Sequence, residues 1–363
     1  MNTPMKSMQK ILAVDIGAGT QDVLLYDAAR TPENCISMIL PSPTRRYVQM
    51  IDRCNEDLLI GGDAIGGGGI ADALDRHLAR GYRVAMTEAA AYTLRNNLDQ
   101  VRAHGICVGD NPPDAGVPLC TIQFDEFDWP AIKQFLSVLG EPGDIDVVAV
   151  AVQDHGVPAE PVSNRAFRFT MIERHLQQDS RLESFAFSLD AIPDCYRRLK
   201  AVASKAQLRC ECPVVAMDTC FAAILGSLEG RETALAVNVG NSHTVAAAFA
   251  GGRLTGLLEH HTGCLSAATL DALLTRFVKG KITSDEVLND GGHGVALLEA
   301  GGIDIEQPII VTGPQRNLLK KSRLQIHFAA PHGNMMLTGP FGLIKGACHV
   351  YGLGLQPSFL RDR

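Results

Sequence analysis

The hydrophobic positions of the chain form short runs of strand length that alternate with segments of helical periodicity. Residues 11–16 and 23–26 are apolar runs on either side of a glycine-rich turn, and they predict a β-hairpin. Strand, glycine turn and strand follow one another again at 234–249. Residues 145–152 are continuously apolar, which is typical of a strand covered on both faces. The order of these elements predicts an α/β protein.

Helical patterns and further strands lie between and after these runs. Residues 212–230 predict a short strand, a turn near Asp218 and a helix of small residues, and 308–314 predict another strand and turn. Pro193 must begin or interrupt an element, because proline is not tolerated inside a helix. We expect helices within 73–81, 88–102, 171–205, 265–278 and 335–350.

The chain contains an internal repeat. The segment LAVDIGAGTQDVLL superimposes on LAVNVGNSHTVAAA, so that Asp15 corresponds to Asn238 and Gly17 to Gly240. Two structurally alike halves follow from this repeat. We place residues 1–228 in an N-terminal domain, with an inserted subdomain around 61–140, and residues 229–363 in a C-terminal domain.

Each copy of the repeat places a polar side chain near the end of a buried strand. A glycine follows two positions later, where the turn begins. Glycine lets the backbone approach a ligand closely, and successive N–H groups in such a turn can hold phosphate oxygens. The alternative is that both turns are ordinary hairpins, in which glycine and polar residues are common. The phosphate-binding candidates are Gly17, Ala18, Gly19 and Thr20 in the first copy and Asn238, Gly240, Asn241, Ser242, His243 and Thr244 in the second. Asp15 is the candidate ligand of Mg²⁺, which takes one or two carboxylates together with phosphate oxygens.

Composition narrows the classes of function. The chain has 363 residues, 46% of them hydrophobic, and a formal net charge of −7. The acidic balance and the absence of a Lys/Arg block argue against a protein that binds the nucleic-acid backbone. No apolar run is long enough to span a membrane, so we expect a cytoplasmic protein without a membrane partner. The ten cysteines are scattered, which favours mostly reduced, buried thiols.

Five segments together resemble the superfamily of acetate and sugar kinases, Hsp70 and actin. The loops at Asp15 and Asn238 are similar to its two phosphate motifs, 214–228 and 337–347 are similar to its two connecting helices, and PIIVTGPQRNLL is similar to its adenosine motif. The resemblance implies two actin-like, ribonuclease H-like domains with ATP and Mg²⁺ in the cleft between them. It also implies that Thr312, Gly313 and Pro314 contact the adenosine.

The sequence departs from the superfamily pattern at several positions. Asn238 stands where many relatives have aspartate, His243 where a small residue is usual, and Gly313-Pro314 where two glycines are usual. More narrowly, the chain resembles a family of unknown function whose members are often labelled pyruvate formate-lyase activating enzymes. That label implies radical chemistry on an iron–sulfur cluster held by three closely spaced cysteines, and no C-x-x-x-C-x-x-C occurs here.

Polar residues follow the apolar run at 145–152, where strand ends face the ligand crevice of an α/β sheet. Asp154 or His155 could act as a general base, and Gln153 could position the attacking group. Alternatively, Asp154 opens a turn before Gly156 and His155 is solvated.

Three other features do not belong to the predicted nucleotide site. The adjacent His260 and His261 should point to opposite sides of a strand, which makes them a poor metal pair. We expect Gly66–Gly69 to be a loop, with an anion-binding nest as the alternative. Cys264 is the candidate for an iron–sulfur ligand, and its role stays open.

Three functions remain open from the sequence. The first is a Mg²⁺-dependent phosphotransferase that uses ATP and an unidentified small metabolite. The second is an ATP-switched activator that acts on a protein partner. The third is a nucleotide-binding module that does not hydrolyse ATP, as Asn238 would allow. A homodimer is an open alternative to a monomer.

Overall fold

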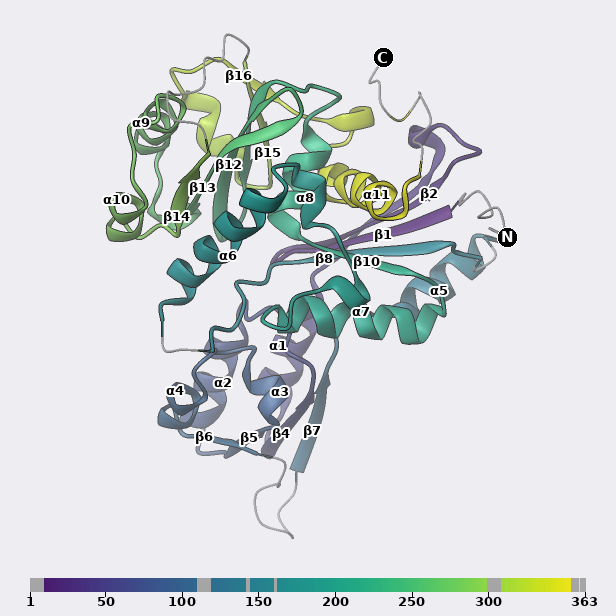
Figure 1. Ribbon diagram of the computed structural model, residues 1–363. Helices are drawn as coiled ribbons and strands as arrows, with labels where there is room; N and C mark the ends of the chain where they lie inside the picture. The colour runs from purple at the N-terminus through teal and green to yellow at the C-terminus, as the bar shows by residue number, and fades with distance from the viewer. Residues whose placement is uncertain are drawn as a thin grey trace.

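The computed structural model describes residues 10–109, 119–141, 144–159, 162–298, 308–353 and 359. Figure 1 shows two large sheets with helices between them and a smaller sheet set apart below. Among the described residues, no helix is long and apolar enough to cross a membrane.

The first sheet has six strands in the order β3-β2-β1-β8-β10-β9. β3, β2 and β1 pair antiparallel, whereas β1, β8 and β10 pair parallel. The apolar run predicted at 145–152 contains β8, whose residues are all buried, and this explains its lack of polar alternation. The bounds are β1 Lys10–Ile16, β2 Thr20–Asp27, β3 Ile36–Pro41, β8 Val147–Val152, β9 Phe187–Ser188 and β10 Val214–Asp218.

The second sheet has six strands in the order β14-β13-β12-β11-β15-β16. β13, β12 and β11 pair antiparallel, β11, β15 and β16 pair parallel, and β14 adds an antiparallel edge. The bounds are β11 Ala234–Val239, β12 His243–Ala250, β13 Arg253–His261, β14 Gly294–Leu297, β15 Ile309–Thr312 and β16 Ile326–Phe328.

Both sheets contain the same unit, three antiparallel strands that continue into two parallel ones. The strands β3-β2-β1-β8-β10 correspond in order and direction to β13-β12-β11-β15-β16. This is the strand order of a ribonuclease H-like domain, and two copies of it make the actin-like fold. The predicted fold class is confirmed.

Two helices cross each other between the sheets, and each follows one sheet in the chain but packs on the other. α8 (Thr219–Ser227) follows the first sheet but packs on β11 and β15 of the second, whereas α11 (Thr338–Tyr351) ends the described helices and packs on β1, β8 and β10 of the first. Figure 1 shows the two helices side by side. A Cβ atom on Gly342 would lie 1.9 Å from the carbonyl oxygen of Ala222, so the backbones touch at the crossing. One apolar core therefore spans both sheets.

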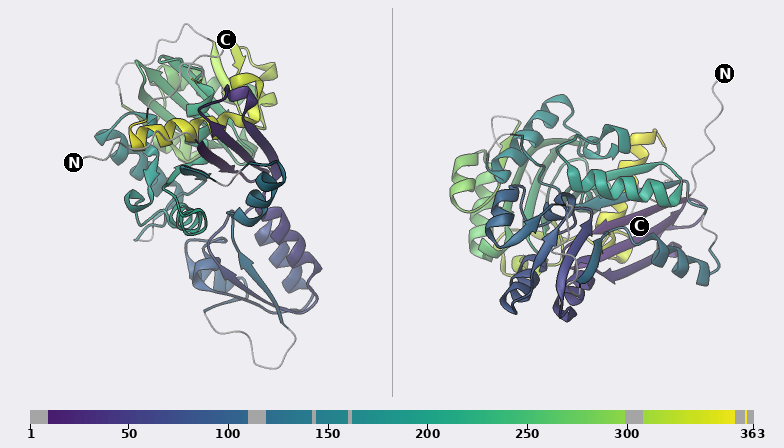
Figure 2. Two further views of the ribbon diagram at one scale, coloured as in Figure 1. Left: turned by 90° about the vertical axis from the view of Figure 1, so that its right-hand side faces the viewer. Right: turned by 90° about the horizontal axis from the view of Figure 1, so that it is seen from below.

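The smaller sheet overlaps the segment predicted to be inserted, around 61–140, but it begins earlier, because β4 covers Asp57–Gly62. Its four strands have the order β6-β5-β4-β7 and all pair parallel. Figure 2 shows that this unit projects from the rest of the molecule. Its elements are α1 Pro43–Arg53, β4 Asp57–Gly62, α2 Ile70–Ala79, β5 Val84–Met86, α3 Glu88–Ala91, α4 Leu98–Ala103, β6 Ile106–Val108 and β7 Leu119–Phe124.

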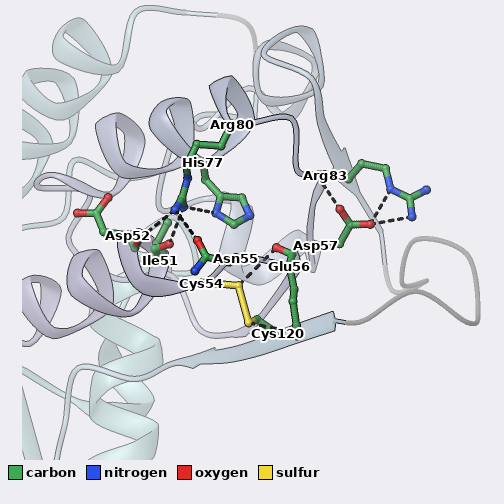
Figure 3. The surroundings of a disulfide bond; sticks show 10 residues. All are labelled: Ile51, Asp52, Cys54, Asn55, Glu56, Asp57, His77, Arg80, Arg83 and Cys120. Atoms are coloured by element: carbon green, nitrogen blue, oxygen red, sulfur yellow. Dashed lines mark hydrogen bonds and ion pairs between the residues drawn. A yellow bond between two sulfur atoms is a disulfide. The ribbon is translucent and has the colours of Figure 1, made fainter.

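A disulfide between Cys54 and Cys120 joins the end of α1 to β7 in this unit (Figure 3). The other eight cysteines are free, so the thiols are mostly reduced, as predicted. The expectation that they are buried was wrong for most of them, because only three of the eight are buried.

Of the remaining helices, α5 and α7 pack on the outer face of the first sheet and α9 on that of the second, whereas α6 contributes to the core that α8 and α11 share. Two predicted helical ranges are interrupted. The range 88–102 breaks between α3 and α4, where the side chain of Asn97 accepts a hydrogen bond from the N–H of Asp99 and begins a new helix. The range 171–205 breaks between α6 and α7, and β9 and Pro193 lie in the gap. The bounds are α5 Trp129–Val138, α6 Asn164–Gln178, α7 Arg197–Cys210, α9 Ala267–Val278 and α10 Ser284–Asn289.

Candidate functional site

The two glycine turns of the repeat have the same backbone geometry. In the first turn the N–H of Gly17 donates to the carbonyl of Thr20, and in the second the N–H of Gly240 donates to the carbonyl of His243, both at 2.9 Å. The turns face each other, since a Cβ atom on Gly19 would lie 2.7 Å from Nδ2 of Asn241. The repeat in the sequence is therefore also a repeat in space, with one turn supplied by each sheet.

Two buried carboxylates lie beside the first turn. Asp15 is the last residue but one of β1 and pairs in register with Asp22 of β2. Oδ1 of Asp15 accepts a hydrogen bond of 2.6 Å from the Thr219 hydroxyl, whereas Oδ1 of Asp22 is buried with no partner among the described residues. Burial, with a smaller contribution from the neighbouring Asp22, raises the pKa of Asp15 to about 8, although the Thr219 hydrogen bond opposes this rise. Burial likewise raises the pKa of Asp22 to about 7.

The strand end that carries Asn238 lies against the predicted adenosine motif. Asn238 pairs in register with Thr312, and the next residue, Gly313, has a φ of +99°. A Cβ atom there would lie 2.5 Å from Oδ1 of Asn238, so both the backbone conformation and the space require glycine. The hydroxyl of Thr312 is buried and bonded to that of Thr338, 3.1 Å away, at the start of α11.

One cleft, which we call the loop cleft, brings most of the predicted site residues together. Both turns, both strand ends and the starts of α8 and α11 line it. Of the predicted residues, Thr244, Thr312, Asp154 and His155 do not line it. The lining residues are Asp15, Gly17, Ala18, Gly19, Thr20, Asp22, Gln153, Thr219, Cys220, Ala223, Asn238, Gly240, Asn241, Ser242, His243, Gly313, Pro314, Met335, Met336 and Thr338.

A second cavity, which we call the arginine pocket, adjoins the loop cleft. Gln153, His243 and the first turn line both, so the two spaces share a wall. Arg95, Arg197 and Arg198 line this pocket, and Asp154 is the single carboxylate among its described lining residues. Gly66–Gly68 form another wall. Gly66 donates its N–H to Glu126 (2.7 Å), so this N–H is not free to bind an anion.

The two predicted bases sit differently from what the sequence suggested. Asp154 accepts hydrogen bonds from the N–H groups of Gly156, Arg198 and Leu199 at 2.8–3.0 Å. Its carboxylate therefore closes a turn and caps the start of α7, which leaves it poorly placed to accept a substrate proton. His155 is only partly exposed, because its ring packs against those of His243 and His293. Burial lowers the pKa of His155 well below its usual value, which makes it a weak base.

An ionic group that the sequence did not reveal joins the two halves behind the pocket. Nε of Arg168 donates to Oε2 of Glu259 at 2.7 Å, and Nη1 donates to Oδ2 of Asp218 at 2.9 Å. All three side chains are buried. Asp218 and Glu259 come from opposite sheets, so Arg168 bridges them.

Strand register explains the positions of other site residues that the sequence did not reveal. Asp22 lies opposite Asp15 in the hairpin, and Glu259 lies opposite Val245 on β12. His260 and His261 point apart, as predicted: the ring of His261 contacts that of His243, whereas Nε2 of His260 lies 3.3 Å from Oδ2 of Asp290.

The sequence matches the model of one known protein family. A family model described as "Putative pyruvate format-lyase activating enzyme (DUF1786)" matches residues 65–318, which is more than half of the chain. The chain belongs to this family. A comparison with curated proteins finds no significant match.

Several solved structures resemble this chain distantly. A protein of unknown function with an actin-like ATPase fold from Bacteroides thetaiotaomicron is 11% identical over 94% of this chain and 98% of its own, with a TM-score of 0.36. The inorganic polyphosphate/ATP-glucomannokinase of Arthrobacter sp. strain KM is 13% identical over 94% of this chain and 99% of its own, also with a TM-score of 0.36.

A third structure matches over a smaller share. The Lmo2764 protein of Listeria monocytogenes, described as "a putative N-acetylmannosamine kinase", is 12% identical over 68% of this chain, with a TM-score of 0.25. This chain spans about half of that protein, 48% of its length. Likenesses this low carry no argument about function, and the assignment of the fold rests on the strand order.

Proposed function

We propose that this protein binds Mg²⁺-ATP in the loop cleft and transfers the γ-phosphoryl group to a small anionic metabolite in the arginine pocket. The observation that carries the proposal is the pair of matching glycine turns, which face each other in one cleft beside two buried carboxylates. N–H groups of such turns bind phosphate oxygens, and a pair of them can hold the β- and γ-phosphates from both sides.

The nucleotide would lie across the second sheet. Its phosphates would contact the turns at 17–20 and 240–243, and its adenosine would extend over Gly313 and Pro314. Met335 and Met336 also line the loop cleft and would offer apolar contact to the base. Thr244 and Thr312 are buried and hydrogen-bonded to other threonines, so they would support the binding backbone without touching the ligand.

The carboxylates of Asp15 and Asp22 fit a magnesium ion. Oδ1 of Asp22 is a buried oxygen with no partner among the described residues, and the raised pKa values of both groups reflect burial without a counter-charge. Hard oxygen ligands of this kind suit Mg²⁺. When bound, magnesium would neutralise charge on the phosphates.

The charge of the arginine pocket supports an anionic acceptor. Arg95 and Arg197 are exposed there, and neither has a carboxylate partner among the described residues, whereas Arg198 is paired with Glu126 at 2.7 Å. Guanidinium groups bind carboxylates and phosphates well. Gln153 lies where the two cavities meet and would orient the acceptor toward the γ-phosphate.

Phosphoryl transfer needs positioning and charge stabilisation more than a strong base. The proposal therefore assigns no general-base role to Asp154 or His155, since the first caps a helix and desolvation lowers the pKa of the second.

The lack of a free base favours a second candidate, an ATP-switched activator that acts on a protein partner. The description of the family as an activating enzyme agrees with this alternative. We do not carry over radical chemistry, because no cysteine triad is present in the sequence. A cytoplasmic location and a homodimer stay predictions.

Nucleotide binding is tested first by calorimetry with Mg²⁺-ATP. We expect Asp15→Asn to weaken binding at least about tenfold, which is about 1.4 kcal/mol. Asp27→Asn is the matched control, because Asp27 ends the same hairpin away from the cleft and bonds the N–H of Ala29. No binding by the wild type, or equal binding by Asp15→Asn, would refute the proposal.

Turnover is tested by following phosphate release and acceptor phosphorylation across a set of small carboxylic and phosphorylated acids. We expect Arg197→Ala to raise KM for the acceptor with little change in kcat, as expected for loss of uniform binding. Phosphate release that requires a protein partner and no small acceptor would favour the activator. Binding without any release would identify a non-hydrolysing module.

A further inference from the structure

Four side chains that could bind a metal meet behind the wall shared by the two cavities. His155, His243, His293 and Glu259 each offer one ligand atom, and these atoms lie within 4.8 Å of one another. The rings of the three histidines contact one another, with centroids 4.7–5.1 Å apart. We call this set the histidine cluster.

The fold brings the histidine cluster together from four separate segments. His155 follows β8 of the first sheet, whereas His243 begins β12 and Glu259 lies on β13 of the second. His293 directly precedes β14, and its N–H donates to the carbonyl of Glu259 at 2.9 Å. The set therefore joins the two halves of the molecule, and it does not include Asp15.

Each member presents a polar atom that is buried and has no hydrogen-bond partner in the part of the chain that the structure describes. These atoms are Nε2 of His155, Nε2 of His243, Nδ1 of His293 and Oε1 of Glu259. Buried polar atoms are almost always paired, because an unpaired one loses its interaction with water. Four such atoms pointing into one small space indicate a missing common partner.

The chemistry of the set favours a cation over an anion. His243 and His293 are buried, and an imidazole nitrogen without a proton can donate its lone pair to a metal ion. The unpaired oxygen of Glu259 would repel an anion. Three imidazoles and a carboxylate are the ligands that divalent first-row transition metals prefer.

Neighbouring groups hold two of the four side chains in place, as outer partners do in metal sites. Oε2 of Glu259 accepts a 2.7 Å hydrogen bond from Arg168, which leaves Oε1 free. Nδ1 of His243 lies 2.7 Å from Nε2 of the Gln153 side-chain amide, and Nε2 of His243 has no partner among the described residues. The oxygen and nitrogen of this amide exchange places when the group is turned over. With its Oε1 turned toward Nδ1–H, the amide of Gln153 would set the tautomer in which Nε2 carries the lone pair.

We propose that His155, His243, His293 and Glu259 bind a divalent first-row transition metal ion, separate from the magnesium site at Asp15. His155 and His243 also line the arginine pocket, so the ion would lie at the inner wall of that pocket and tie the two sheets together. His261 lies next to the set, with its ring centroid 4.6 Å from that of His293, and could add a fifth ligand.

The test uses tag-free, full-length protein that is stripped with a chelator and then titrated with Zn²⁺ or Co²⁺ in the absence of nucleotide. We expect one equivalent of Zn²⁺ to bind, a rise in Tm, and visible absorption from bound Co²⁺. His155→Ala and His293→Ala should each weaken Zn²⁺ binding at least about a hundredfold, the upper end of the loss seen when only an outer partner is removed.

Two controls make the result specific. His327→Ala should bind Zn²⁺ like the wild type, since His327 lies on β16 and is paired with Glu229. Asp15→Asn should also keep its Zn²⁺, which separates this site from nucleotide binding, so that either proposal can fail alone. Circular dichroism and the metal-free Tm check that each variant is folded.

Three results would overturn the proposal. One is a wild-type protein that takes up no stoichiometric Zn²⁺, as expected if only water fills the space. Another is Zn²⁺ binding that survives in both His155→Ala and His293→Ala. The third is equal loss in His327→Ala, which would indicate adventitious surface binding.

Discussion

Arg168 gives the sharpest test of how the two halves are held together. Its guanidinium lies between Asp218 of the first sheet and Glu259 of the second, and the three side chains are 3%, 6% and 0% exposed. It also donates to the carbonyl of Asp154 at 2.9 Å. The substitution Arg168→Met keeps most of the apolar stem and removes the charge, which leaves two carboxylates buried without a cation.

The expected cost follows from this burial. Removal of one partner from a buried ion pair destabilises a protein by about 3–5 kcal/mol, because the remaining charge is buried and unpaired. The same substitution at Arg46, whose pair with Asp128 is 50% and 31% exposed, should cost at most about 1 kcal/mol. The double variant Arg168→Met/Glu259→Gln should lose less free energy of unfolding than the two single variants lose together, because Glu259 no longer carries an unpaired charge.

The assay is urea unfolding in the presence of a chelator, so that metal binding does not contribute. Trp129 is the only tryptophan, and it lies on α5 beside the first sheet, so its fluorescence follows that half while circular dichroism follows both. The reasoning is refuted if the free energy of unfolding of Arg168→Met is within about 0.5 kcal/mol of that of Arg46→Met, or if the double variant is strictly additive.

Three further predictions concern stability. Gly342→Val should lower the free energy of unfolding by about 3 kcal/mol or more, because the new Cβ would lie 1.9 Å from a backbone oxygen of α8. The control Gly263→Val should change the free energy of unfolding little, because a side chain there meets open space. Equal effects of the two substitutions would contradict the close helix crossing. Asp154→Ala should lower the free energy of unfolding by about 1–2 kcal/mol and speed amide hydrogen exchange at Arg198 and Leu199, whose N–H groups it caps. Asp154→Asn should lie nearer to the wild type. Loss of turnover at unchanged stability would instead indicate that Asp154 acts as a base. Cys54→Ser should lower the stability of the inserted unit by about 2–4 kcal/mol, since the disulfide closes a separation of 66 residues; alkylation of both cysteines without reductant would show that the bond is absent.

The sequence predicted what depends on local pattern. Both hairpins, the buried strand β8 and the small-residue helices α8 and α11 follow from runs and turns that can be read within about fifteen residues. The repeat then implied two like halves, and the structure brings Gly17 and Gly240 into one cleft. The helix expected at 88–102 broke in two because a local cap at Asn97 competes with continuation.

What the sequence could not supply is the set of contacts made by strand register and by packing between the halves. Asp22 was missed because its role depends on lying opposite Asp15. His155, His293 and Glu259 lie far apart in the chain. The pairing of β12, β13 and β14 brings His293 and Glu259 together, and the packing of the two sheets against each other adds His155. Asp154 was placed correctly at a strand end, but the approach of α7, which occupies its carboxylate, has no signal in the sequence.

The most direct test of the central claim is a crystal structure with Mg²⁺ and a non-hydrolysable ATP analogue. The account predicts that the β- and γ-phosphates lie between the turns that follow Asp15 and Asn238, within hydrogen-bond distance of backbone N–H groups of both. It also predicts the magnesium ion beside Asp15 and Asp22. A nucleotide bound elsewhere, or one whose phosphates contact only one of the two turns, would contradict it.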